Sequence, residues 1–380
     1  MNRTRPKRTG GLLSYGNCSN AGDVLIFQTF NKLFEDDVET TWHHVRLDKL
    51  DVKARNVIIG PGGLLSGSYR PDVNPDELVI RHLTPIRLAA WKKQGRPVFA
   101  FGTGTNTPFE NGPTSKPFSV ESGKTIAKLA NVSDGLYLRG SADIRRLSAF
   151  CATDDLNKFK FQPCPSVFLD RLFSIRPETS DQIAINFPLE KSLTPENAKT
   201  HPLRRFVEFA KSLGLSVALL DNHPSDINKT ALEIFDPPRS DPGQAAFMSL
   251  LQNEGDGQKL FEQRWTSSPF VASRFNGYRF AFGVRLHSFL PFMAFNTPSV
   301  FLAGNPIRMP MALEYFRSPV FGAKVAFGQA SLGQVVDGMI ERLRFFVRNE
   351  DRLRAEIADQ RSRLWEITSN NKAEMLGRMN

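Results

Sequence analysis

The chain has 380 residues, 41% of them hydrophobic and 23% charged, which suits a globular protein of roughly two domains and excludes a disordered or collagen-like chain. Its 49 Lys and Arg residues outnumber 39 Asp and Glu residues, and this net charge of +10 favours anionic partners such as phosphorylated metabolites. No stretch reaches the roughly 20 apolar residues of a membrane span. Three cysteines without CxxC spacing argue against a disulfide framework or a zinc site, so we expect a cytoplasmic protein.

Residues 1–10 carry four basic residues and no acid, and we interpret them as a basic tail. From residue 11 to residue 170, short apolar runs alternate with helical patterns. Strands are predicted at Leu12–Tyr15, Thr41–Val45, Asn56–Ile59, Val98–Phe101 and Leu136–Leu138, and helices at Asp23–Phe34, Glu77–Gln94, Ser122–Ala130 and Ala142–Phe150. Because alternating strands and helices form parallel sheets with crossover helices, this region is predicted to be a Rossmann-like domain.

Residues 171–180 read as a polar linker, after which the alternation restarts over residues 181–330. Strands are predicted at Gln182–Phe187, Ser216–Leu220, Tyr278–Gly283 and Ser299–Leu302, and helices at His201–Leu213 and Ser288–Phe295. Residues 331–380 form a helical segment, strongest over Leu332–Ile367, with a break near Arg348–Asp351. The sequence therefore predicts an α/β fold of two Rossmann-like domains facing a central cleft, with ligands at the carboxyl ends of the strands.

Glycines and small polar residues follow three strands of the first domain. The candidate ligand-binding residues among them are Asn20, Gly22, Asp23, Gly62, Gly63 and Gly104. Glycines let a ligand approach the backbone closely, and the amide groups at a helix start can hold an anion. The alternative is that Asp23 only caps the following helix and the glycines only make turns.

A fourth strand end carries Arg139, with Ser141 two residues later in a position to cap the next helix. A guanidinium group binds carboxylate or phosphate through two parallel hydrogen bonds, so Arg139 is a candidate anion clamp. An ion pair with a neighbouring loop is an equal alternative.

The most informative pair is Arg285 and His287, which follow an apolar strand and open an apolar helix. Residues two apart point to one face of an extended backbone, so a fixed cation and a titratable imidazole are expected side by side. Such a pair suits an anionic substrate that needs proton transfer, whereas a histidine on an apolar face can also be a packed core residue. No metal-ligand spacing appears, so we expect no obligatory metal.

In this order, the motifs resemble those of the polysaccharide pyruvyltransferase family over roughly Tyr15 to Pro310. The matching segments are Asn20-Ala21-Gly22-Asp23, Gly60-Pro61-Gly62-Gly63, Leu138-Arg139 with Ser141, and Val284-Arg285-Leu286-His287. The chain departs from the family pattern at an inserted Pro61, at Cys164-Pro165-Ser166 in place of an acidic turn, at Asn296 in place of a glycine, and at Arg308 in place of a lysine.

The resemblance implies the GT-B arrangement of two-domain glycosyltransferases and a transferase that moves pyruvate from phosphoenolpyruvate onto a sugar. Arg285, Arg139 and Arg308 would bind the donor, and His287 would act as general acid or base. The first domain would hold the acceptor, a surface or exported glycan or a lipid-linked oligosaccharide. The family implies no cofactor and no tightly bound metal.

Other functions stay open on the residues alone. One is a nucleotide-sugar-dependent glycosyltransferase of the same architecture, and another is a non-catalytic sugar-binding relative. A nucleic-acid-binding protein is disfavoured, because no nucleic-acid motif and no aromatic residues interleaved with a basic patch are present. The mixed charges of the carboxyl-terminal helices are typical of a solvated face, with docking at the inner face of a membrane as the alternative.

Overall fold

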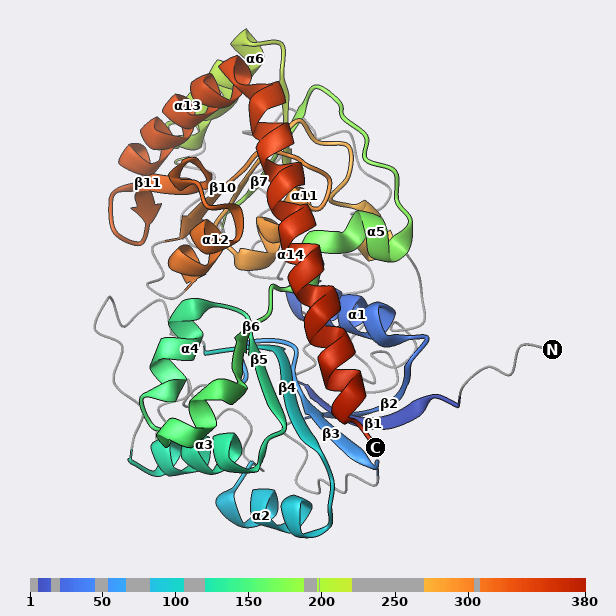
Figure 1. The fold of residues 1–380 in the computed structure, drawn as a ribbon. Helices are drawn as coiled ribbons and strands as arrows, with labels where there is room; N and C mark the ends of the chain where they lie inside the picture. Colours follow the sequence, from blue (N-terminus) through green and yellow to red (C-terminus); the bar gives the residue numbers. More distant parts are fainter. Residues whose placement is uncertain are drawn as a thin grey trace, which may run out of the picture.

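The computed structural model describes residues 6–14, 21–44, 54–65, 83–105, 120–187, 197, 199–220, 270–303 and 308–380. Its first domain is built on a six-stranded sheet in the order β2-β1-β3-β4-β5-β6 (Figure 1). The strands are β1 (Arg8–Ser14), β2 (Val38–His44), β3 (Asn56–Ile59), β4 (Val98–Thr103), β5 (Gly135–Leu138) and β6 (Phe159–Phe161). The helices are α1 (Ala21–Phe34), α2 (Pro85–Lys93), α3 (Val120–Val132) and α4 (Ser141–Ser148), and η2 (Thr153–Lys158) is a 3₁₀ helix. All neighbouring strands pair in parallel, as the alternating pattern predicts.

The second domain has a five-stranded parallel sheet in the order β11-β10-β9-β7-β8. The strands are β7 (Gln182–Asn186), β8 (Ser216–Leu219), β9 (Phe280–Gly283), β10 (Ser299–Ala303) and β11 (Gly322–Phe327). The helices are α6 (Leu203–Ser212), α10 (Phe270–Ser273), α11 (Leu290–Met293), α12 (Arg308–Phe316) and α13 (Leu332–Arg348), with the 3₁₀ helices η5 (Leu286–Ser288) and η6 (Pro319–Phe321). Between the domains lie η3 (Pro165–Phe168) and α5 (Leu169–Phe173). The predicted α/β class with two parallel units is confirmed.

The core of the first domain shows why these strands read as continuous apolar runs. Every residue of β4 is buried, as expected for a parallel strand that is covered on both faces. From one face, α1 directs Phe30 and Phe34 onto the sheet, and the Phe34 ring stands edge-on to Phe101 of β4 at 5.1 Å between centroids. The three- and four-residue spacing of apolar residues in α1 therefore marks the face that meets the sheet.

Three predicted boundaries differ from the structure. β1 begins at Arg8, inside the predicted tail of residues 1–10, because Arg8 to Gly10 pair with β2. The helix predicted over Glu77–Gln94 is described from Pro85, where the Thr84 hydroxyl accepts the Arg87 N–H at 3.3 Å, and residues 66–82 lie outside the described residues. The helix predicted at Ser288–Phe295 is divided into η5 and α11.

The carboxyl-terminal segment crosses back to the first domain. The predicted helical break is confirmed at Asn349, and α14 (Glu350–Arg378) then extends well beyond Ile367. Figure 1 shows α14 lying across both domains. Near its start Glu350 pairs with Arg279 of the second domain, and near its end Glu374 pairs with Lys160 of the first. The helix therefore ties the two sheets together.

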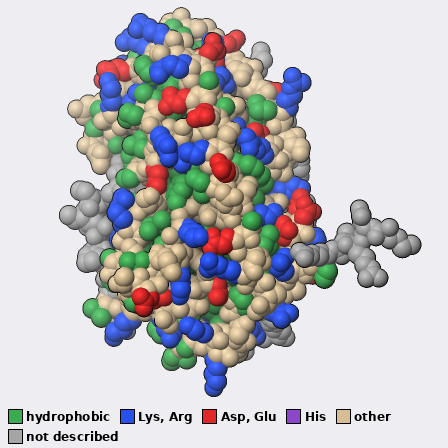
Figure 2. Space-filling view, viewed as in Figure 1, with side chains coloured by type: hydrophobic (Ala, Val, Ile, Leu, Met, Phe, Trp, Pro, Cys, Tyr) green, Lys and Arg blue, Asp and Glu red, His purple; other side chains and the backbone are tan. Residues whose placement is uncertain are grey.

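Charge on this side of the molecule is mixed. Figure 2 shows basic side chains scattered among acidic ones rather than gathered into one patch. Among the described helices, none is both long and apolar enough to cross a membrane.

Candidate active site

His287 lies where the two domains meet. It belongs to η5, directly after β9 of the second sheet. Its ring packs on Gly22 in the first turn of α1, where an added β-carbon would come within 2.7 Å of Nδ1. Its other ring nitrogen, Nε2, lies 3.8 Å from the Cys164 thiol of the first domain. The carboxyl ends of the two sheets thus face each other across this imidazole.

The backbone around His287 is not extended, and this prediction was wrong. A 3₁₀ turn begins after Arg285, and Ser288 stabilises it: its hydroxyl accepts the Arg285 N–H at 3.1 Å and donates to Asn186 Oδ1 at 2.7 Å. The rule that residues two apart in an extended strand point to the same face therefore does not apply to Arg285 and His287. Both side chains keep partial exposure at the junction.

The electrostatic surroundings keep the imidazole neutral. The pKa of His287 is lowered from 6.5 to about 3. Burial is the largest cause, and the positive charges of Arg139 and Arg308 add to it. The structure therefore brings three of the predicted residues together: the neutral imidazole of the second domain, the arginine that follows β5 and the arginine that begins α12. Two positively charged arginines beside a neutral imidazole are suited to an anionic ligand.

Arg139 is itself almost fully buried, with 4% of its surface exposed. Its guanidinium donates to the Thr105 carbonyl at 2.8 Å, and its Nε lies 3.9 Å from Asp143 Oδ2. Burial raises the pKa of Asp143, whereas Arg139 and hydrogen bonds from Thr105 act in the opposite direction. Arg139 thus forms an ion pair with Asp143 of the next helix, α4, rather than with a neighbouring loop, and its charge lowers the pKa of His287 from within the protein.

Gly104 is part of the same arrangement. An added β-carbon at Gly104 would lie 2.3 Å from Asp143 Oδ2, so the glycine makes room for this carboxylate. Gly62 has a φ of +119° and exchanges backbone hydrogen bonds with the end of β4, from its N–H to Gly102 and from Gly104 to its carbonyl. The adjacent Gly63 is half-buried. In this structure Gly62 and Gly104 are explained by backbone geometry and packing.

Ser141 does not cap α4, because the N-cap position is Gly140. Instead, the Ser141 N–H donates to Glu314 Oε2 at 2.9 Å, and its hydroxyl bonds the other oxygen of the same carboxylate. Glu314 belongs to α12, which also carries Arg308 at its first residue. Ser141 therefore holds the second domain against the first.

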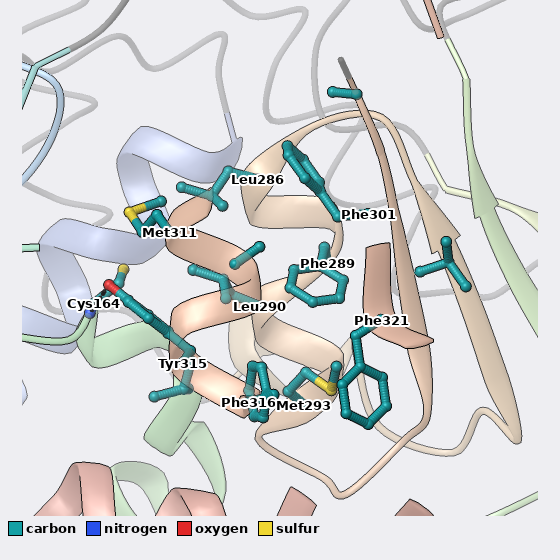
Figure 3. Close-up of a cluster of buried hydrophobic side chains, with 14 of the residues drawn as sticks. Cys164, Leu286, Phe289, Leu290, Met293, Phe301, Met311, Tyr315, Phe316 and Phe321 are labelled. Carbon is teal, nitrogen blue, oxygen red and sulfur yellow. Dashed lines mark hydrogen bonds between the residues drawn. The ribbon is translucent and has the colours of Figure 1, made fainter. Parts of the chain in front are cut away.

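Tyr315, the next residue of α12, reinforces this contact. Its hydroxyl accepts the Cys164 N–H at 2.7 Å and donates to the Arg139 carbonyl at 2.8 Å. Figure 3 shows Cys164 beside Met311 and Tyr315, at the edge of the apolar cluster of the second domain. One helix of the second domain thereby connects the ends of β5 and β6 in the first.

Three contributors were missed in the sequence: Cys164, Glu314 and Tyr315. Only Cys164 had a signal, as a departure from an expected acidic turn, and nothing local distinguishes the other two. Asn20 lies outside the described residues, as does the side chain of Asp23. Within the described parts of the chain, no group of three or more His, Cys, Asp or Glu side chains could hold a metal ion.

Comparison with known proteins agrees with this architecture. A UDP-glucosyltransferase from Polygonum tinctorium aligns over 98% of this chain and 97% of its own, with 9% sequence identity and a TM-score of 0.51. A UDP-GlcNAc 2-epimerase from Methanocaldococcus jannaschii aligns over 88% of this chain and 92% of its own, with 10% identity and a TM-score of 0.43. At such identities the likeness concerns the fold, and the first of these structures supports the GT-B-like arrangement.

Sequence comparison is more specific about the family. A search of the curated proteins returned no match. The family described as polysaccharide pyruvyl transferase matches residues 20–306, a span that begins just before α1 and includes β5, Cys164 and the turn that carries His287. Because this match covers most of the chain and both halves of the junction around His287, the chain belongs to the polysaccharide pyruvyl transferase family.

Proposed function

We propose that this protein transfers pyruvate from phosphoenolpyruvate to a glycan hydroxyl and releases phosphate. The observation that carries the proposal is the position of His287, a neutral imidazole between the two domains with the charges of Arg139 and Arg308 close by. Phosphoenolpyruvate carries its carboxylate and its phosphate on C2, the carbon that the hydroxyl attacks, and its C3 takes up a proton. A positively charged site can bind these two anionic groups, and a proton-transferring group can move the proton that the reaction requires.

The arginines have different tasks in this proposal. Arg308 and Arg285 are only partly buried, so their guanidinium groups can contact the carboxylate and phosphate of the donor. Arg139 is held by Thr105 and Asp143 and contributes its charge from beneath the site. The glycine-bearing start of α1 packs against the imidazole from the first domain, the domain that would hold the acceptor sugar.

The chemistry balances without a further reactant. An acceptor hydroxyl adds to C2 of phosphoenolpyruvate while C3 receives a proton, which leaves a tetrahedral carbon bearing the sugar oxygen, the carboxylate, a methyl group and phosphate. A second sugar hydroxyl then displaces phosphate and closes a cyclic pyruvate ketal. The first hydroxyl proton accounts for the proton gained at C3, and the second leaves with phosphate.

His287 would take the proton of the first hydroxyl. In the free protein its pKa of about 3 makes it a poor base at neutral pH. A donor phosphate or carboxylate beside Arg139 and Arg308 offsets their charge, and this raises the pKa of the imidazole. Proton transfer would therefore become favourable only once the donor is bound.

The test uses ¹⁴C-labelled phosphoenolpyruvate with a panel of glycan acceptors, alongside the same acceptors with labelled nucleotide sugars. We expect label transfer from phosphoenolpyruvate, loss of transfer in His287→Gln, and weaker donor binding in Arg308→Met. Lys324→Met is the matched control, because Lys324 is an exposed residue of β11 paired with Glu341. Transfer from a nucleotide sugar, or an active His287→Gln enzyme, would overturn the proposal.

A further inference from the structure

Cys164 is held rigidly against His287. Its backbone N–H donates to the Tyr315 hydroxyl at 2.7 Å, and the residue is 3% exposed. Its thiol lies 3.1 Å from the Ser166 hydroxyl and 3.8 Å from His287 Nε2. The sulfur is therefore placed between a hydroxyl of the connecting turn η3 and an imidazole of the second domain.

The protonation states of the pair restrict how they bond. Burial raises the pKa of the Cys164 thiol, so the sulfur keeps its proton at neutral pH. A neutral imidazole has one N–H group, on either Nδ1 or Nε2. If the Ser166 oxygen accepts the thiol proton, a sulfur lone pair is available to His287 Nε2 at 3.8 Å, whereas with Ser166 as the donor the thiol proton would go to Nε2.

The other ring nitrogen faces a different environment. Nδ1 lies against Gly22 in the first turn of α1, a helix of 14 residues. The first N–H groups of a helix have no partner within it, and its amino-terminal end carries partial positive charge. The partial positive charge at this end of α1 disfavours an N–H group on Nδ1 and favours a lone pair there.

We infer that Cys164 is a positioning residue that accepts a hydrogen bond from His287 Nε2–H and so directs the basic lone pair on Nδ1 toward the start of α1. The inference rests on the proposed function, in which the imidazole takes the proton of the acceptor hydroxyl. A thiol orients the ring without adding negative charge, unlike the carboxylate that commonly supports a histidine. The imidazole is therefore oriented yet stays weakly basic until the anionic donor arrives.

Nuclear magnetic resonance of the full chain tests the tautomer without any need for activity. In ¹⁵N-histidine-labelled protein at pH 7, the signals of His287 are assigned by their loss in His287→Gln. We expect a protonated Nε2 and an unprotonated Nδ1. A proton on Nδ1, or an imidazolium ring, would overturn the inference.

Variants then separate orientation from simple packing. Cys164→Ala is expected to give a mixture of tautomers and a kcat lower by on the order of 10-fold, with an unchanged KM for phosphoenolpyruvate. Cys164→Ser keeps an acceptor and should restore the tautomer and most of kcat. Cys151→Ser is the matched control, because this half-buried cysteine lies just after α4 and its thiol donates to the Leu147 carbonyl of that helix at 3.3 Å.

The possible outcomes distinguish the two proposals. A wild-type tautomer pattern in Cys164→Ala would refute the positioning role, whatever the activity. The expected tautomer pattern in a protein that transfers no pyruvate would leave the orientation standing and remove the proposed reaction.

Discussion

Replacing Gly22 by alanine tests how closely the two domains pack at the imidazole. Gly22 lies in the first turn of α1, where alanine is compatible with the helical backbone. An added β-carbon would lie 2.7 Å from His287 Nδ1, 2.9 Å from its Cβ and 3.0 Å from its Cγ. The methyl group would thus meet the whole near edge of the ring, and the ring or α1 must shift.

Opposing effects set the expected stability change. Alanine in place of glycine in a helix stabilises by about 0.5–1 kcal/mol, whereas an extra methyl group in a packed site costs about 1–3 kcal/mol. We therefore expect the free energy of unfolding to fall by no more than about 2.5 kcal/mol, so the variant folds. Misplacement of a reacting group by about 1 Å can cost on the order of 100-fold in rate, and we expect a loss of that size in pyruvyl transfer.

The assay combines urea unfolding with transfer from labelled phosphoenolpyruvate. Gly377→Ala is the control, because this glycine lies in α14 and an added β-carbon there would meet nothing within 4 Å. That variant should be slightly more stable than the parent and fully active. Undiminished transfer by Gly22→Ala would refute the conclusion that Gly22 and His287 act in contact.

The remaining predictions concern stability. Arg361 is 3% exposed and binds Asp170, the Val167 carbonyl and Asn296, so Arg361→Met should lower the free energy of unfolding by about 3–5 kcal/mol. Urea unfolding measures this change, with Lys324→Met as the exposed control, for which we expect a change of roughly 0.5 kcal/mol at most. A change in Arg361→Met no larger than that of the control would contradict the prediction. As pH falls from 6.5 toward 3, the unfolded chain gains a proton at His287 that the native protein excludes, so native stability should fall by about 1.4 kcal/mol per pH unit. The free energy of unfolding, measured between pH 6.5 and 4.5, should fall more steeply in the parent than in His287→Gln by this amount, because other buried groups such as His201 titrate in both proteins, and parallel curves would refute the prediction.

Much of the architecture was predictable from local pattern. Parallel strands covered on both faces must be apolar throughout, so β3, β4 and β5 stand out as short hydrophobic runs. The helical period of α1 and the break at Asn349 are likewise local properties. Because ligands bind at strand ends in such folds, the turn after β9 was also a reasonable place to seek a site.

The conformation of that turn was not predictable from spacing. The sequence around Arg285 and His287 predicts the end of an extended strand. The chain turns there instead, because the Ser288 hydroxyl hydrogen-bonds the Arg285 backbone and Asn186 of β7. Asn186 is 102 residues away in sequence, so the partner that favours the turn exists only after β7 and β9 pair. Local sequence propensity does not include the effect of such a distant partner, so it could not predict this turn.

The sequence by itself determined the alternation of strands and helices, the family, and a histidine at a strand end. The tertiary structure decided what surrounds that histidine. Cys164 is 123 residues from His287, and Glu314 is 173 residues from Ser141, so these contacts form only when the two domains dock. Docking also buries the imidazole beside two arginines and lowers its pKa, since burial and neighbouring charge are properties of the assembled protein and not of any residue in isolation.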